Sequence, residues 1–227
     1  MRTYYVTYAD EAFNRQAKIS CWLARRFGNF DGVIHKTPAS IDTDFKIQNQ
    51  NILNLNRGGG YWLWKPYIIA RLLAEIRHGD VILYVDAGAH LIRSPRRFLQ
   101  FFIDSRQDVG AFELPLIERQ WTKSICFNRI VPDRNEDMNT NQLQASFIII
   151  KKTEKSVNFI NEYLQYCKDP MLLLDDTEDQ PITSNFIAHR HDQSIFSLLY
   201  KKYRFIPFED ISHRGLNPAT YALSTFP

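Results

Sequence analysis

The run Val81–Val85, of sequence VILYV, constrains the fold of this chain more than any other segment. It is a short, continuous apolar run rich in β-branched and aromatic residues, bounded by the polar residues Asp80 and Asp86. Such a run lacks the alternation of a strand with one solvated face and is typical of a strand buried on both faces. We therefore expect a central strand with other elements packed above and below it.

Similar apolar runs alternate with segments of helical periodicity along the chain. Further strands are expected at 3–8, 33–34, 109–112, 146–150 and 203–206. Apolar residues at helical spacing predict helices over 66–77, 153–167 and 192–201. This alternation predicts an α/β fold with a mainly parallel central sheet flanked by helices. Ligands of such sheets bind beyond the carboxyl ends of the strands, which is where functional residues are sought.

Length, charge and cysteine content limit the classes of protein. A chain of 227 residues predicts a single domain. The 28 basic and 25 acidic residues are interspersed and leave a net charge of +3, so we expect no nucleic-acid partner. Cys21, Cys126 and Cys167 are widely separated, which excludes a disulfide framework. With no signal-like or membrane-spanning run, a cytoplasmic protein is expected.

Asp86 follows the buried run directly, and the small residues Ala87 and Gly88 come next. A carboxylate at the carboxyl end of such a strand, with no bulk beside it, can hold a divalent cation that bridges a diphosphate. An aspartate that only caps the following turn would have the same pattern. Both interpretations stay open on these residues alone.

The segment VILYVDAG, preceded by YWLWKPYIIARLLAEIRHGD, resembles the nucleotide-sugar-binding half of GT-A-type glycosyltransferases, in particular small transferases of bacterial capsule and lipopolysaccharide gene clusters. The resemblance covers 61–91, 121–123, 142–152 and 189–202. It implies a single GT-A-like domain, in which about 1–92 bind the nucleotide sugar and about 93–227 bind the acceptor. It also implies sugar transfer from a nucleotide-diphosphate donor, expected to be a UDP-sugar, to a hydroxyl of a carbohydrate or lipid-linked acceptor in polysaccharide synthesis.

GT-A enzymes end the equivalent strand in Asp-x-Asp, whose carboxylates bind manganese or magnesium. The resemblance therefore assigns donor and metal binding to Asp86, with Ala87 and Gly88 beside the donor, but Gly88 replaces the second aspartate. Another residue supplies the ligand, or phosphates complete the ion's coordination, or no metal is used. His90 and His213 are the candidate substitutes, because imidazole suits manganese. His213, in ISHRG, resembles the C-terminal histidine ligand of glycogenin-like transferases.

Asp192 and Gln193 lie at the start of a predicted helix in HRHDQSIFSLLYKKY, a stretch that resembles the same transferases. The resemblance makes Asp192 the general base if the reaction inverts the sugar's configuration, which we favour. If configuration is retained, Asp192 and Gln193 hold the donor sugar instead. An N-cap role would explain Asp192 without function. His189 and His191 would line the acceptor site or brace Asp192.

Five other residues have a candidate ligand role. Gln144, in NQLQASFIIIKK, resembles a donor-sugar contact of glycogenin-like enzymes, with Ser146 as a weaker candidate. Trp121 would stack on an acceptor sugar beside Lys123, or anchor a loop. Tyr8 ends the first strand, where this architecture recognises the base.

The segment RGGGYWLWKPY contains three glycines before a helix, which could admit a phosphate or simply form a turn with Trp62 in the core. Lys65 opposes the helix macrodipole there. A contact with the donor diphosphate would explain it, as would a solvated surface position.

Two other functions compete with glycosyl transfer. A non-catalytic sugar- or nucleotide-binding domain is favoured by Gly88, whereas a nucleotidyltransferase is disfavoured because Asp10 and Glu11 would repel a triphosphate. The apolar and basic stretches SPRRFLQFF and LLYKKYRF are candidates for peripheral contact with an anionic membrane, although half-buried helices share their pattern.

Overall fold

The computed structural model describes residues 1–175 and 185–210. Their centre is a five-stranded sheet in the order β2-β1-β3-β5-β4. The strands are β1 (Thr3–Tyr8), β2 (Gly32–Lys36), β3 (Val81–Val85), β4 (Val109–Ile117) and β5 (Asn141–Lys151). β1 is parallel to β2 and β3, whereas β5 is antiparallel to β3 and β4, so β5 alone runs against the other strands of this sheet. The expected α/β fold with a mainly parallel sheet is confirmed.

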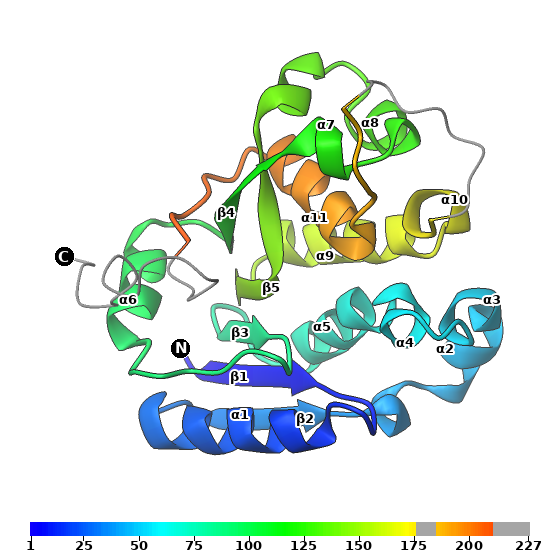
Figure 1. The fold of residues 1–227 in the computed structure, drawn as a ribbon. Helices are drawn as coiled ribbons and strands as arrows, with labels where there is room; N and C mark the ends of the chain where they lie inside the picture. The colour runs from blue at the N-terminus through cyan, green and yellow to red at the C-terminus, as the bar shows by residue number, and fades with distance from the viewer. Residues whose placement is uncertain (176–184, 211–227) are drawn as a thin grey trace.

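Helices cover both faces of the sheet (Figure 1). The longer ones are α1 (Asn14–Phe27), α5 (Trp64–Glu75), α6 (Arg96–Asp104), α9 (Glu154–Cys167) and α11 (His191–Lys202). Short helices connect them: α2 (Thr43–Gln48), α3 (Gln50–Leu53), α4 (Gly58–Tyr61), α7 (Glu118–Trp121), α8 (Ser124–Ile130) and α10 (Pro170–Leu173). Helices α5, α9 and α11 pack on one face, and α1 and α6 pack on the other.

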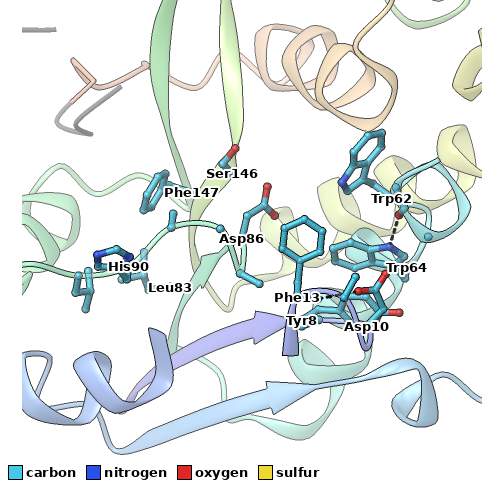
Figure 2. A pocket seen from close by; sticks show the side chains of 18 of the residues that line it. Tyr8, Asp10, Phe13, Trp62, Trp64, Leu83, Asp86, His90, Ser146 and Phe147 are labelled. Atoms are coloured by element: carbon cyan, nitrogen blue, oxygen red, sulfur yellow. Dashed lines mark hydrogen bonds between the residues drawn. The ribbon is translucent and has the colours of Figure 1, made fainter. Parts of the chain in front are cut away.

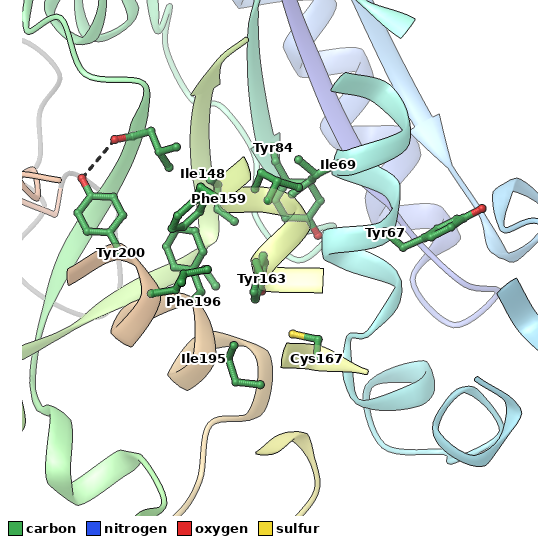
Figure 3. Close-up of a cluster of buried hydrophobic side chains, with 14 of the residues drawn as sticks. Tyr67, Ile69, Tyr84, Ile148, Phe159, Tyr163, Cys167, Ile195, Phe196 and Tyr200 are labelled. Atoms are coloured by element: carbon green, nitrogen blue, oxygen red, sulfur yellow. Dashed lines mark hydrogen bonds between the residues drawn. The ribbon is translucent and has the colours of Figure 1, made fainter. Parts of the chain in front are cut away.

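The strand β3 is buried along its whole length, as its sequence predicts. Ile82 and Tyr84 join the larger apolar cluster under α5, α9 and α11, which Figure 3 shows around Phe159 and Phe196. The alternate residues of β3 join the smaller cluster under α1 and α6. A strand whose two faces are both covered leaves mainly its ends accessible, and Asp86 follows the carboxyl end of β3 directly.

The three predicted helices are present as α5, α9 and α11, although α5 begins at Trp64. The predicted strand at 203–206 is wrong. Tyr203 caps α11 instead, and Arg204 takes a φ of 56°. The aromatic residues there pack into the core, with the rings of Phe159 and Phe205 5.5 Å apart. Core packing of a loop therefore gives these residues the composition of a strand.

Candidate functional site

A pocket of about 780 Å³ opens at the carboxyl ends of β1 and β3 (Figure 2). Tyr8, Asp10 and Trp64 form one end, and Asp86 lies in the middle. The other end combines the apolar side chains of Leu83 and Phe147 with the imidazole of His90. This is the edge at which α/β sheets bind ligands. The volume is in the range of sites for small molecules and cofactors.

Asp86 is held with its carboxylate toward the pocket. Its backbone N–H donates to the carbonyl of Ser146 on β5 at 2.9 Å, and its own carbonyl accepts from Ala89 at 2.9 Å. The Tyr84 hydroxyl donates to Oδ1 at 2.6 Å. Added bulk at Gly88 would meet nothing within 4 Å, so the space beside Asp86 is open.

Lys65 lies between two carboxylates behind the pocket. Its Nζ is 2.8 Å from Asp192 Oδ2 and 3.3 Å from Asp86 Oδ1, and it donates to the carbonyl of Ala145 at 3.2 Å. Burial lowers the pKa of Lys65, but the two carboxylates outweigh it, and the pKa is raised. Lys65 is thus a buried ammonium, which excludes a solvated surface position.

Asp192 lies in the first turn of α11 and is 4% exposed. No side chain caps this helix; the Asp192 carboxylate instead binds Lys65 and accepts from the Tyr163 hydroxyl at 3.1 Å. Burial raises the pKa of Asp192, against the opposing effect of Lys65. Asp192 is not among the pocket-lining residues, so its carboxylate has no direct path to the pocket in this arrangement. Its role as the general base stays a prediction.

The glycine segment forms a left-handed turn that builds the aromatic end of the pocket. Residues 58–62 all have positive φ, including the non-glycine residues Tyr61 and Trp62. Left-handed backbone costs an ordinary residue about 1–2 kcal/mol, which is why glycine suits the first three positions. The N–H groups of Gly59 and Gly60 donate to the carbonyls of Asn56 and Arg57, so neither is directed at a phosphate.

Trp62, the last residue of this turn, and Trp64 line the pocket, and Trp62 also packs, partly buried, against the larger apolar cluster as predicted. Trp64 Nε1 donates to the carbonyl of Gly58 at 2.9 Å, and its ring stacks on Tyr8 with centroids 3.9 Å apart. Burial, with the nearby Asp10, raises the pKa of Tyr8 to about 12. Trp62, Trp64 and Asp10 are pocket residues that the sequence analysis did not select.

Behind the pocket is a set of enclosed polar residues that we name the buried polar layer: Lys65, Glu118, Gln142, Asp192 and Gln193. The Gln193 amide donates to Gln142 Oε1 at 2.8 Å and accepts from the backbone N–H of Ala145. Glu118 accepts from Ser197, Lys201, Thr122 and Gln142. These bonds join α11 to β5 and α7, so Gln193 contacts protein rather than the pocket.

Three predicted acceptor residues meet at the end of α10. Lys123 Nζ donates to the carbonyls of Met171 and Leu174, each at 2.6 Å. His189 Nε2 is 2.8 Å from the carbonyl of Leu172, and His191 Nδ1 is 3.0 Å from that of Leu173. Burial lowers the pKa of both histidines, that of His189 strongly. They bind the carbonyl end of a helix and do not line the pocket.

Some of the remaining predicted residues line the pocket and others lie outside it. Tyr8, Asp86, Ala87 and Gly88 line the pocket together with His90 and Ser146. Trp121 lies outside it, with the Arg190 guanidinium 5.5 Å from its ring centroid. Gln144 is fully buried, and neither atom of its amide has a hydrogen-bond partner among the described residues. His213 lies outside the described residues.

The side chains at this site do not by themselves surround a divalent ion. Within residues 1–175 and 185–210, no three side chains of ligand type converge on one point. Asp86 offers a carboxylate that is 29% exposed, while Lys65 occupies the space between it and Asp192. Magnesium commonly binds through one or two carboxylates together with substrate phosphates and water. Asp86 would supply one such carboxylate, and the remaining ligands would come from bound phosphate and water.

No protein-family model and no curated protein sequence matches this chain. Solved structures do. The apo structure of the bifunctional glycosyltransferase WbbM is 11% identical with a TM-score of 0.51, over 97% of this chain and 43% of that one. Mouse xyloside xylosyltransferase 1 is 10% identical with a TM-score of 0.49, over 92% of this chain and 85% of that one. The WbbM likeness shows that the chain has the fold of GT-A-type glycosyltransferases.

Proposed function

We propose that this chain is a glycosyltransferase that moves a sugar from a nucleotide diphosphate to a hydroxyl of a carbohydrate acceptor. The observation that carries the proposal is the position of Asp86. It directly follows a fully buried strand and faces a pocket of about 780 Å³ in a GT-A fold. A nucleotide sugar needs a site of this size with a carboxylate near its diphosphate.

The aromatic end of the pocket suits a nucleoside. The rings of Trp64 and Tyr8 stack on each other there, and the carboxylate of Asp10 also lines this end. A pyrimidine base can pack on such rings, and a carboxylate can accept its ring N–H. The proposed donor is therefore a UDP-sugar with its base near Tyr8 and its diphosphate near Asp86.

In the proposed reaction, the acceptor oxygen forms a bond to the anomeric carbon while the bond to the diphosphate breaks. A divalent ion held by Asp86 would neutralise the leaving diphosphate. Lys65 fixes the orientation of Asp86 through the 3.3 Å contact, and Asp192 holds Lys65 from the other side. We favour inversion of configuration, with Asp192 as the base. Its carboxylate would receive the proton of the acceptor hydroxyl when the acceptor comes within hydrogen-bond distance of it.

The proposal is tested by incubating the protein with a panel of nucleotide sugars and carbohydrate acceptors, with and without manganese. Transfer or slow hydrolysis is expected, with a loss on the order of 100-fold or more in Asp86→Asn. The exposed Asp133→Asn is the matched control and keeps full activity. Turnover that is the same in Asp86→Asn and Asp133→Asn contradicts the assignment of Asp86.

The configuration of the product tests Asp192. If Asp192 is the base of an inverting reaction, Asp192→Asn loses transfer much more than it loses donor affinity. A product of retained configuration would remove the base role and leave Asp192 as a residue that positions Lys65.

A non-catalytic binding domain is the second candidate function. It is favoured by Gly88 in place of a second carboxylate and by the enclosure of Asp192 between Lys65 and Tyr163. Such a domain would bind nucleotide sugars and release them unchanged under every metal condition, which the same panel would detect.

A further inference from the structure

The outer face of α1 combines exposed apolar side chains with a cluster of positive charge. Trp22 is 61% exposed and Ile19 is 46% exposed, at neighbouring positions of one helical face. The exposed cations of the helix are Arg15, Lys18, Arg25 and Arg26, and the helix contains no acidic residue. The opposite face, with Ala17, Ser20, Cys21 and Ala24, is buried against the sheet.

Within residues 1–175 and 185–210, no acidic side chain neutralises these cations. None of the four forms an ion pair with an acidic residue in the part of the chain that the structure describes. The Arg26 guanidinium lies 5.6 Å from the ring centroid of Phe27, its neighbour on the helix. Asp10 and Glu11 precede α1 and are separated from Arg25 and Arg26 by most of the helix, about 20 Å at 1.5 Å per residue.

We propose that α1 is a docking surface for an anionic lipid bilayer. The charge of this face selects an anionic partner, since it carries cations and no acid. The exposed tryptophan and isoleucine select a partner with an accessible apolar layer, because Trp settles at the interface between head groups and acyl chains. An amphipathic helix with a basic polar face lies in that interface with its apolar residues inserted.

The position of α1 next to the pocket suggests what membrane docking would do. Phe13 directly precedes α1, is 51% exposed and also lines the pocket. Figure 2 shows its ring between Asp86 and Trp64. A bilayer that holds α1 would therefore bring one rim of the pocket close to the lipid surface. An acceptor carried on a lipid would meet the site there, and this last step rests on the proposed transferase function, whereas the docking does not.

The two stretches that the sequence suggested for membrane contact are less suitable. In SPRRFLQFF, the side chains of Phe98, Leu99 and Phe102 are buried in α6. In LLYKKYRF, residues 198–200 are fully buried in α11. Most of their apolar side chains therefore belong to the core, although Phe101 is 39% exposed. No helix in the described residues has the length and apolarity to cross a membrane, so contact through a surface such as α1 would be peripheral.

Vesicle flotation tests the docking. The probes are vesicles of phosphatidylcholine alone and of phosphatidylcholine mixed with phosphatidylglycerol, each at low and high salt. The protein is expected to float with the anionic vesicles at low salt and to be released by high salt, because screening weakens the attraction. The double variant Arg25→Gln/Arg26→Gln should lower partitioning on the order of 10-fold or more, because each lost cation weakens the electrostatic attraction to the anionic lipid surface.

Trp22→Ser should also reduce partitioning, and the wild-type Trp22 fluorescence should shift to the blue on binding. Ile47→Ser and Arg77→Gln are the matched controls, because both residues are exposed and lie outside α1. They should bind as the wild type does. Lack of flotation at low salt, or equal flotation of the α1 variants and the controls, would overturn the proposal.

Sedimentation and donor binding complete the test. A dimer that Trp22→Ser dissociates would show that a second copy covers this face, and would also overturn the proposal. Nucleotide-diphosphate affinity should be unchanged in Trp22→Ser, since Trp22 does not line the pocket. If the wild type floats but binds no nucleotide, the proposed function fails while the docking stands.

Discussion

Asp86 and Asp192 are both aspartates in contact with Lys65, but their surroundings differ. The side chain of Asp86 is 29% exposed and faces the pocket, whereas that of Asp192 is 6% exposed and bonded to Lys65 and Tyr163. An exposed carboxylate keeps the capacity to bind a ligand, while an enclosed one is satisfied by the protein. Substitutions in the buried polar layer should therefore change stability most, and substitutions at Asp86 should change ligand binding most.

The largest effect on stability is expected from Lys65→Met. It leaves two carboxylates near each other without their counter-ion, and the loss of one partner of a buried ion pair costs about 3–5 kcal/mol. Urea unfolding followed by fluorescence measures the change. The exposed Lys155→Met should cost less than about 1 kcal/mol. Equal small losses in both variants would show that Lys65 is not a structural cation.

Glu118→Gln should have the next largest effect. Glu118 is fully buried and accepts hydrogen bonds from Ser197, Lys201 and Thr122. Loss of its charge weakens these bonds, and a hydrogen bond to a charged group contributes about 1.5–3 kcal/mol. The same unfolding measurement applies, with the exposed Glu75→Gln as the control. Donor affinity should stay unchanged, and a selective loss of affinity would place Glu118 with the pocket.

Alanine substitutions in the left-handed turn should separate backbone strain from steric contact. At Gly59, a Cβ would lie no closer than 3.6 Å to its neighbours, so Gly59→Ala should cost about 1–2 kcal/mol for the left-handed backbone alone. At Gly60, a Cβ would come within 2.7 Å of Leu53 Cα, so Gly60→Ala should cost more. The reverse order in thermal or urea unfolding would contradict the turn.

The smallest expected effect is a pH dependence from His189. Burial, with Lys123 and His191 nearby, keeps the pKa of His189 well below its usual value. The unfolded chain takes up a proton near pH 6.5 and the folded protein does not, so stability falls as pH drops below about 6.5. Urea unfolding at several pH values should show this loss reduced in His189→Gln and unchanged in the exposed His78→Gln. An identical pH dependence in both variants would contradict the burial of His189 as its cause.

The sequence predicts the frame of the fold because its signals are local. The uninterrupted apolar run of β3 and the helical spacing in α5, α9 and α11 each depend on residues that are close in the chain. The strand expected at 203–206 failed because Phe205 packs on Phe159, a contact between residues far apart in sequence. Periodicity carries no information about such contacts.

Only the part of the site that depends on local sequence signals could be predicted. The place of Asp86 at the pocket could be predicted because the buried strand before it fixes where it leaves the sheet. The contacts of Lys123, His189 and His191 with the carbonyl end of α10 could not be predicted, because polar side chains in such contacts have the same composition as an acceptor site. Trp62 and Trp64 were missed since only the left-handed turn of residues 58–62 brings them to the pocket.

Calorimetric titration with UDP in the presence of manganese tests the central claim most directly. The wild type should bind UDP, and Asp86→Asn should bind it at least about 10-fold more weakly while its unfolding free energy changes little. The side chain keeps its shape in that variant and loses its charge. If UDP binds the wild type and Asp86→Asn with the same affinity, Asp86 does not contact the diphosphate and the account of this pocket is wrong.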